Sequence, residues 1–119
     1  MTVLIVDDAP DIRFMLRVVL EDAGMEVEEA GSGEAALDRL ADPDGISAVV
    51  LDQRMPGLTG LEVARRLREA GSHPPVVLFS AYLHPTLRAE ADELGLTTVD
   101  KTDLFELVEV LRSDERVAA

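Results

Sequence analysis

Four places along the chain put reactive side chains directly after short runs of apolar, mostly β-branched residues. Asp7 and Asp8 follow the first run, Asp52 follows a second, and Ser80 and Lys101 follow two later ones. Because the carboxyl ends of parallel strands open onto one crevice, we expect these side chains to lie close together. Three carboxylates, a hydroxyl and an ammonium group are the components of a site for Mg²⁺ and a phosphoryl group.

Lys101 is the only lysine among the eleven lysine and arginine residues of the chain. An arginine would serve for an ordinary surface charge, whereas a compact ammonium on a flexible stem suits close contact with a single oxygen. The isolated lysine therefore indicates a specific contact at the end of its strand.

The three aspartates require a partner of opposite charge, because two carboxylates 4 Å apart repel each other by about 4 kcal/mol at an effective dielectric constant near 20. A Mg²⁺ ion supplies it, since this ion prefers oxygen ligands and usually takes only one or two protein carboxylates. Taken alone, Asp7 and Asp8 are equally well interpreted as acidic residues that cap the following helix. Asp11 is assigned to the start of that helix because it follows Pro10.

Asp52 favours the catalytic interpretation. It precedes a loop rich in proline and glycine, residues 53–60, which continues neither a strand nor a helix. A carboxylate beside a metal can attack phosphorus and form an acyl phosphate. The Ser80 hydroxyl and the Lys101 ammonium would then bind two phosphoryl oxygens and the metal a third.

Composition limits the class of protein. The chain has 119 residues, which is enough for one domain and too few for two, and it has no cysteine, which excludes disulfides and thiolate metal sites. A formal net charge of −13 argues against direct binding to nucleic acid. The first apolar run ends after six residues, too short for a signal peptide or a membrane span, so we expect a cytoplasmic protein.

Short aliphatic runs alternate with helical patterns, which predicts an α/β fold with a doubly wound, five-stranded parallel sheet and five helices. Residues 1–119 form a single domain in this prediction, and the polar tail at 114–119 is expected to fray. The predicted strands are 2–6, 25–30, 47–51, 75–79 and 97–100, and the predicted helices are 10–23, 33–41, 59–70, 85–94 and 102–113.

A motif with two glycines suggests a different function. Gly31, Gly33 and Ala36 match a loose dinucleotide-binding fingerprint, with Asp52 near the spacing of a ribose-binding acid. The fingerprint belongs after the first strand, and here it follows the second, so we set this interpretation aside. Flavin mononucleotide binding is also disfavoured, because Asp7 and Asp8 would repel its phosphate.

Two further groups of polar residues are interpreted as structural. His73 and His84 are far apart in sequence and lie beside prolines, which indicates loop residues rather than a metal-binding pair. Glu26, Glu28 and Glu29 are most simply the solvated part of the second strand.

The first helix carries apolar residues on two sides. Its core stripe contains Ile12, Leu16 and Leu20, whereas Phe14 and Val18 fall nearly opposite and should be exposed. Single exposed apolar side chains are common, so docking of a partner is one of two open interpretations.

From Val3 to about Arg112 the chain resembles the receiver domains of two-component response regulators. The resemblance implies the CheY-like, flavodoxin-like fold with strand order 2-1-3-4-5. The matching features are Val6-Asp7-Asp8, the helix pattern Arg13, Leu16, Leu20 and Gly24, the segment Asp52-Gln-Arg-Met-Pro-Gly-Leu-Thr-Gly60, Ser80-Ala81, and Lys101.

The resemblance also implies a role for each matching residue. Asp52 would be the phosphoacceptor, and Ser80 and Lys101 would hold the phosphoryl group. Asp8 and Asp52 would bind Mg²⁺ directly, Asp7 through water, and the backbone carbonyl of Arg54 would be a further ligand. The implied partners are a histidine kinase or histidine phosphotransfer protein, docking on the first helix at Phe14 and Val18, and a downstream effector; a homodimer is possible.

The chain departs from the usual receiver pattern near the lysine. Thr102 replaces the usual proline, which disfavours a cis peptide bond there, and the stretch from Gly95 to Lys101 looks one residue shorter than is common. Thr98 replaces the usual aromatic switch residue. Tyr82, at a position that the family associates with the lifetime of the phosphorylated state, is the nearest aromatic substitute.

The sequence leaves three functions open. A phosphoacceptor receiver, which is not an enzyme in its own right, would take a phosphoryl group onto Asp52 and change the surface of the fourth helix, fifth strand and fifth helix. An atypical receiver would act as an unphosphorylated interaction module, as Thr98 and Thr102 favour. A haloacid-dehalogenase-type phosphohydrolase would need an Asp-x-Asp pair, which Asp7-Asp8-Ala9 does not supply.

Overall fold

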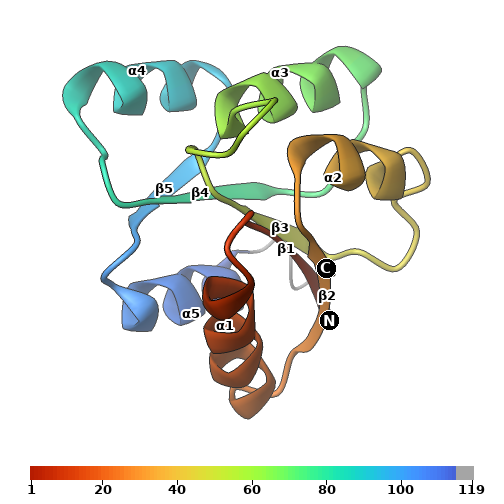
Figure 1. The fold of residues 1–119 in the computed structure, drawn as a ribbon, viewed down its shortest axis with the longest axis vertical. Coiled ribbons are helices and arrows are strands. Elements are labelled where there is room, and N and C mark those ends of the chain that lie inside the picture. The colour runs from red at the N-terminus through yellow and green to blue at the C-terminus, as the bar shows by residue number, and fades with distance from the viewer. Residues whose placement is uncertain (115–119) are drawn as a thin grey trace.

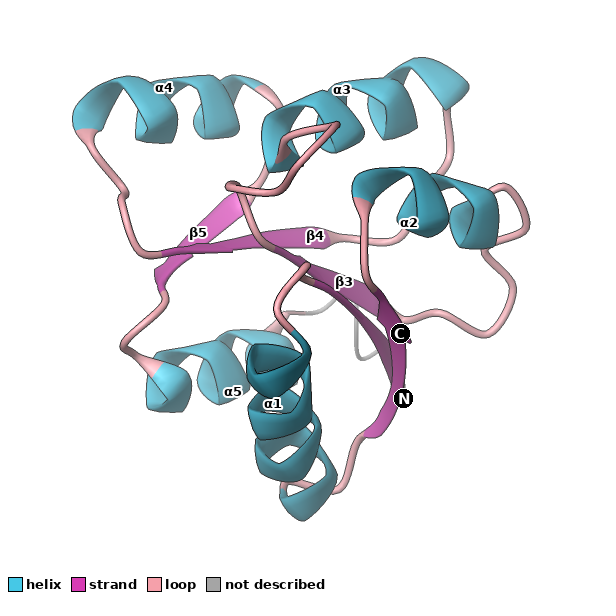
Figure 2. Cartoon of the chain, in the orientation of Figure 1, coloured by secondary structure: helices cyan, strands magenta, loops and turns pink. Residues whose placement is uncertain are grey.

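Strands and helices alternate along the whole of the computed structural model, which describes residues 1–114 (Figures 1 and 2). Loops, drawn in pink in Figure 2, connect each strand to the helix that follows it. The elements are β1 (Thr2–Val6), α1 (Pro10–Asp22), β2 (Glu26–Ala30), α2 (Gly33–Leu40), β3 (Ala48–Leu51), α3 (Gly60–Ala70), β4 (Val76–Ser80), α4 (Pro85–Glu93), β5 (Thr97–Asp100) and α5 (Leu104–Ser113). The predicted number and order of elements are confirmed.

The five strands form one parallel sheet in the order β2-β1-β3-β4-β5, as the receiver resemblance implies. Strand β1 lies between β2 and β3, where Val6 pairs with Ala30 on one side and with Leu51 on the other. The first connection therefore runs from β1 to β2 on one side of it, and the next connection crosses back to β3 on the other side of β1. This reversal of strand order opens a crevice at the carboxyl ends of β1 and β3.

Helices cover both faces of the sheet. Helices α1 and α5 lie on one face, and α2, α3 and α4 on the other (Figure 1). Alternate residues of β1 divide between the two cores: Val3 and Ile5 pack with the first group, and Leu4 and Val6 with the second. Burial on both faces explains why the central strands read as continuous apolar runs, and it fixes the strand ends firmly.

Side-chain caps set the starts of four helices. Ser32, Thr59, His84 and Asp103 each accept a hydrogen bond from a backbone N–H three residues later. His84 is thus a helix cap rather than a plain loop residue. Helix α5 begins later than predicted, because Asp100 first accepts a hydrogen bond from the Thr102 N–H and so forms a turn.

The glycine motif after β2 has a packing explanation. A Cβ atom on Gly33 would lie 2.7 Å from Val63 Cγ2 and 2.9 Å from Leu58 Cβ, closer than side-chain atoms approach. Glycine therefore lets α2 pack tightly against α3. This contact accounts for the residue that suggested a dinucleotide fingerprint.

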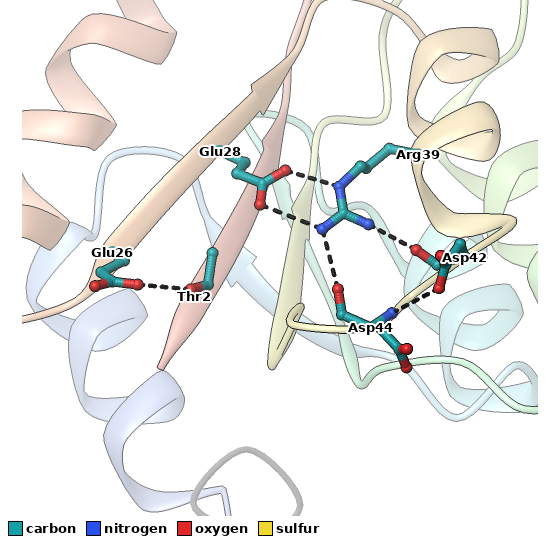
Figure 3. Close-up of polar contacts among 6 residues, drawn as sticks. All are labelled: Thr2, Glu26, Glu28, Arg39, Asp42 and Asp44. Carbon is teal, nitrogen blue, oxygen red and sulfur yellow. Dashed lines mark hydrogen bonds and ion pairs between the residues drawn. The ribbon is translucent and has the colours of Figure 1, made fainter.

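The outer strand β2 is tied to the helices on either face by ion pairs. Glu28 forms a two-point contact with Arg39 of α2, whose guanidinium also donates to the carbonyls of Asp42 and Asp44 (Figure 3). Glu26 accepts a hydrogen bond from the Thr2 hydroxyl of β1 (Figure 3). On the other face Glu29 pairs with Arg13 and Arg17 of α1.

Glu28 and Glu29 are accessible to solvent, as expected, and they also form ion pairs that residue types did not indicate. Because β2 is an edge strand, both helices that flank it can reach its side chains. We call Glu28, Glu29, Arg13, Arg17 and Arg39 the β2-edge cluster.

Two expectations concern the chain as a whole. No helix among residues 1–114 is long and apolar enough to cross a membrane. The expected fraying at 114–119 falls outside the described residues except at Asp114, whose backbone N–H bonds to the Val110 carbonyl and closes α5.

Candidate functional site

The ends of four strands deliver the candidate residues to one edge of the sheet. Asp7, Asp52 and Lys101 each follow the last residue of their strand, and Ser80 is the last residue of β4. Backbone hydrogen bonds continue the strand pairing at these positions: Asp52 N–H donates to the Val6 carbonyl, and Lys101 N–H donates to the Ser80 carbonyl. The sheet itself therefore fixes where these side chains emerge.

The three acidic side chains meet as predicted. Carboxylate oxygens of Asp7, Asp8 and Asp52 all lie within 4.8 Å of one another. Asp7 and Asp52 are only 2% and 6% exposed, whereas Asp8 is exposed. Oxygen donors so arranged suit a hard divalent cation, with the exposed side leaving room for water or phosphate oxygens.

The Lys101 ammonium lies between the two buried carboxylates. Its Nζ atom is 2.8 Å from Asp7 Oδ2 and 3.1 Å from Asp52 Oδ1. One ammonium thus pairs with two of the three carboxylates. The group, which we call the strand-end cluster (Asp7, Asp8, Asp52 and Lys101), carries an excess of negative charge. The lone lysine is a half-buried ion-pair partner and not a fully solvated surface charge.

Burial and repulsion shape the ionisation of this cluster. Burial raises the pKa of the Asp52 carboxyl, and the neighbouring Asp7 raises it further, against the opposing pull of Lys101. Burial alone would lower the pKa of the Lys101 ammonium, but its hydrogen bond to Asp7 and the charge of Asp52 outweigh burial and raise it. A cation is therefore retained beside a carboxylate whose charge is costly, as in sites that bind or react.

Ser80 and Ala81 complete the wall of the hollow above the acids. Ser80 is buried, and its hydroxyl oxygen accepts a hydrogen bond from the Tyr82 N–H at 3.4 Å. The hollow has a volume of about 240 Å³ and is lined also by the strand-end cluster, Ala9 and Arg54. The hydroxyl, the ammonium and the carboxylates therefore border one space.

Arg54 and Tyr82 line this hollow and contact each other. The Arg54 guanidinium lies 4.4 Å from the centre of the Tyr82 ring, a cation–π contact. On its other side is a second hollow of about 500 Å³, lined by Gln53, Met55 and His84 among others. Arg54 and Tyr82 thus separate the acidic hollow from a neighbouring groove.

Thr98 lies on β5, away from the hollow. It is half-buried, and its hydroxyl oxygen accepts a hydrogen bond from Arg88 Nη1 of α4 at 3.3 Å. The described residues contain no cis peptide bond, so the Lys101–Thr102 bond is trans as expected. Thr98 therefore ties β5 to α4 at the position where the receiver resemblance implies an aromatic ring.

Helix α1 exposes the predicted apolar pair. Phe14 and Val18 are 68% and 51% exposed. Asp11 lies in the first turn, as expected, but the residue that precedes the helix is Ala9, which offers no side-chain cap. Asp8 is therefore not a cap, and its carboxylate belongs to the strand-end cluster.

Two features were missed in the sequence. Phe105, near the start of α5, is largely exposed. Arg13 donates a hydrogen bond from Nη1 to the backbone carbonyl of Asp7 at 2.7 Å. A contact to a backbone carbonyl leaves no signature in residue types, although Arg13 falls on the turn of α1 nearest the strand end.

The model of the response regulator receiver domain matches residues 3–112. The chain belongs to this family. Among solved structures, this receiver is similar to chemotaxis protein CheY4 of Vibrio cholerae, with a TM-score of 0.83, 30% identity and coverage of 93% of this chain and 95% of that one. It is also similar to TrrA of Thermotoga maritima, solved in complex with Mg²⁺-BeF, with a TM-score of 0.81, 32% identity and coverage of 93% and 96%.

Curated relatives of the receiver are longer. It is 44% identical over 79 residues to the uncharacterized transcriptional regulatory protein YkoG of Bacillus subtilis, covering 66% of this chain and 34% of that protein. It is 38% identical over 100 residues to the cyclic di-GMP phosphodiesterase response regulator RpfG of Xanthomonas campestris, covering 81% and 26%. The chain spans about a third or less of the length of these relatives.

Proposed function

We propose that this receiver accepts a phosphoryl group on Asp52 from the phosphohistidine of a histidine kinase or histidine phosphotransfer protein, in a reaction that needs Mg²⁺. The observation that carries the proposal is the buried Asp52 carboxylate, which shares Lys101 with Asp7 and borders the same hollow as Ser80. The proposal treats residues 1–119 as one receiver domain that acts in the cytoplasm and has no turnover activity of its own.

The chemistry is a displacement at phosphorus. A carboxylate oxygen of Asp52 would form the new O–P bond while the N–P bond of the donor breaks and its electron pair returns to the imidazole nitrogen. Ser80 would donate its hydroxyl hydrogen to one phosphoryl oxygen, and the Lys101 ammonium would bind another. Burial of Asp52 keeps water away from the resulting acyl phosphate until the site opens.

The residues present fit a Mg²⁺ ion. The three aspartates offer hard oxygen atoms within 4.8 Å of one another, and their charge exceeds that of Lys101. Asp8 and Asp52 would bind the ion directly, Asp7 through water, and the Arg54 carbonyl would be a further ligand. When bound, Mg²⁺ would neutralise the charge that gathers on the carboxylates and the phosphoryl oxygens.

Phosphorylation would act on the surface of α4, β5 and α5, where an effector would bind. Thr98 is too small and too restricted at χ1 to copy the usual aromatic switch. Tyr82 lines the hollow, where its ring contacts the Arg54 guanidinium and its N–H donates to the Ser80 hydroxyl oxygen. We assign the movement to Tyr82 and the loop up to Pro85, with Thr98 staying in place.

The phosphodonor protein would dock on α1. Phe14 and Val18 present an exposed apolar pair there, one turn apart on the helix that follows Asp7 and Asp8. A donor seated on this pair could bring its phosphohistidine to the adjacent hollow. A homodimer, if it forms, would use faces other than this part of α1.

The alternative is an atypical receiver that works unphosphorylated, which Thr98 and Thr102 favour. Incubation of the protein with Mg²⁺ and a small-molecule phosphodonor separates the possibilities by intact mass and released phosphate. A gain of one phosphoryl group per chain supports the phosphoacceptor. No gain supports the atypical module, and steady release of phosphate without accumulation supports a phosphohydrolase.

A further inference from the structure

Arg13 reaches from the first turns of α1 back to the end of β1. Its Nη1 atom donates to the Asp7 carbonyl at 2.7 Å, and its Nε atom donates to Glu29 Oε1 at 3.0 Å. The guanidinium thus joins a helix, the edge strand and the peptide between Asp7 and Asp8. A planar guanidinium can hold two acceptors at fixed angles in this way.

Neighbouring groups hold the guanidinium itself in place. Glu29 Oε2 accepts a further hydrogen bond from Arg17 Nε at 2.7 Å, so the glutamate that orients Arg13 is anchored to α1 a second time. On the other side Gly31 lies beside the guanidinium, where an added Cβ would be 3.4 Å from Arg13 Nη1. The Arg13 side chain is only 20% exposed.

This contact completes the attachment of Asp7. Its N–H donates to the Ala30 carbonyl, its Oδ1 accepts from the Ala9 N–H, its Oδ2 pairs with Lys101, and its carbonyl accepts from Arg13. Every polar group of Asp7 therefore has a partner, each from a different residue. The peptide that begins at its carbonyl is the one that carries Asp8.

Asp8 depends on that peptide. Its side chain is exposed and forms no hydrogen bond or ion pair within residues 1–114, although its carboxylate belongs to the strand-end cluster. Only the backbone can aim it. We propose that Arg13 is a positioning residue that fixes the Asp7–Asp8 peptide and so directs the Asp8 carboxylate toward the Mg²⁺ position, an inference that rests on the proposed metal site.

A positioning role and a purely electrostatic role of Arg13 predict different changes in Mg²⁺ affinity when the residue is replaced. The positive charge of Arg13 lies near the carboxylates, so if charge alone mattered, Arg13→Gln would bind Mg²⁺ more tightly and Arg13→Lys would bind it as the parent does. If Arg13 positions the peptide, both variants bind Mg²⁺ more weakly. A lysine has one compact donor group in place of the two-pronged fork that serves Asp7 and Glu29 together.

The test measures Mg²⁺ affinity by calorimetric titration of the parent, Arg13→Lys, Arg13→Gln and the matched control Arg17→Gln, which contacts Glu29 but not Asp7. Circular dichroism in EDTA checks that each variant folds. We expect about tenfold weaker binding for both Arg13 variants, the lower end of the effect of groups that support metal ligands, and a change within about twofold for the control. Parental affinity in Arg13→Lys, or tighter binding in Arg13→Gln, would overturn the proposal.

A second measurement needs no metal. In EDTA, amide hydrogen exchange at Ala9, whose N–H donates to Asp7 Oδ1, should be faster in the Arg13 variants than in the parent or in Arg17→Gln, because the peptide has lost its anchor. Unchanged exchange would overturn the positioning role. A parent that binds no Mg²⁺ would refute the proposed metal site instead, and amide exchange would still decide whether Arg13 fixes the peptide.

Discussion

The strand-end cluster and the β2-edge cluster both combine carboxylates with cations, but they differ in burial and in balance of charge. In the β2-edge cluster three arginines serve two glutamates at the solvent boundary. The strand-end cluster contains three carboxylates and a single ammonium, which pairs with the two buried ones, Asp7 and Asp52. Exposed pairs in which every carboxylate has a cation tie an edge strand to its helices at little cost. A buried excess of one charge is costly, and a fold retains it where something must bind.

The direction of the pKa shifts follows the same division. A hydrogen bond from Arg39 lowers the pKa of Glu28, and hydrogen bonds from Arg17 and Arg13 lower that of Glu29. Burial raises the pKa of Asp52. The fold thus favours the ionised form of the edge glutamates and disfavours that of Asp52.

The largest effect should come from removing the exposed member of the strand-end cluster. Asp8→Ala should weaken Mg²⁺ binding by about a hundredfold or more, since loss of a direct ligand should exceed the effect of loosening a supporting group. In EDTA the same variant should melt higher than the parent, because like-charge repulsion among the aspartates is relieved. Thermal melts with EDTA and with excess Mg²⁺ measure both effects.

Asp11→Ala is the matched control for Asp8→Ala, because it removes the same charge from the first turn of α1, outside the cluster. It should keep parental Mg²⁺ affinity. An Asp8→Ala variant that melts lower than the parent in EDTA would contradict the charge repulsion within the cluster. One that gains as much stability from Mg²⁺ as the parent would contradict the assignment of Asp8 as a metal ligand.

A smaller effect is expected at the mouth of the strand-end cluster. Tyr82→Ala should dephosphorylate several-fold faster, because the ring and its Arg54 partner no longer shield the hollow; Tyr82→Phe, which keeps the ring, should resemble the parent. Backbone amide shifts with a beryllofluoride mimic should move from Tyr82 to Pro85 and stay unchanged at Thr98. An unaltered rate in the alanine variant would refute the shielding, and unmoved shifts in the loop would refute the switch.

The two clusters should also respond oppositely to pH. The raised pKa of Asp52 means that the metal-free folded protein holds its proton more tightly than the unfolded chain, so this residue lowers stability as pH rises through the raised pKa. The lowered pKa of Glu28 means the reverse: its stabilisation is present above the usual glutamate range and is lost as pH falls through the folded value.

Urea unfolding in EDTA across this pH range measures the difference. The gain in stability of Asp52→Asn over the parent should increase with pH, whereas Glu28→Gln should lose stability relative to the parent as pH rises. If the free energy of unfolding changed with pH in the same way in the parent and both variants, the predicted difference in pH dependence between the two clusters would be wrong.

The smallest effect belongs to the β2 edge. Arg39→Gln removes an exposed ion pair and should lower the melting temperature by no more than about 5 °C, with Mg²⁺ affinity unchanged. Differential scanning calorimetry with and without Mg²⁺ checks both points. A change in Mg²⁺ affinity would mean that the two clusters are coupled through β2.

Much of this architecture could be read from residue types. Apolar runs gave the strands within one residue, and the breaks at Gly24 and Pro56 gave the turns, because local chemistry determines both. The acids converge because parallel strands share a direction. Helix α5 began two residues later than predicted, since the Asp100 carboxylate binds the Thr102 N–H, which periodicity does not encode.

Contacts between distant elements were harder to predict. The pairing of Glu28 with Arg39 and of Glu29 with Arg13 depends on which helix lies over the edge strand. The bond from Arg13 to the Asp7 carbonyl involves a backbone atom, which has the same chemistry at every residue. Such contacts become visible only when the fold is assembled.

The most direct test of the central claim is the intact mass of the parent and of Asp52→Asn after incubation with a small-molecule phosphodonor, with Mg²⁺ or with EDTA. The asparagine amide is nearly the same shape as the carboxylate but cannot act as the nucleophile. We predict one added phosphoryl group on the parent in Mg²⁺, little in EDTA, and none on the folded variant in either. A phosphoryl group gained by Asp52→Asn to the same extent as by the parent would contradict the assignment of Asp52.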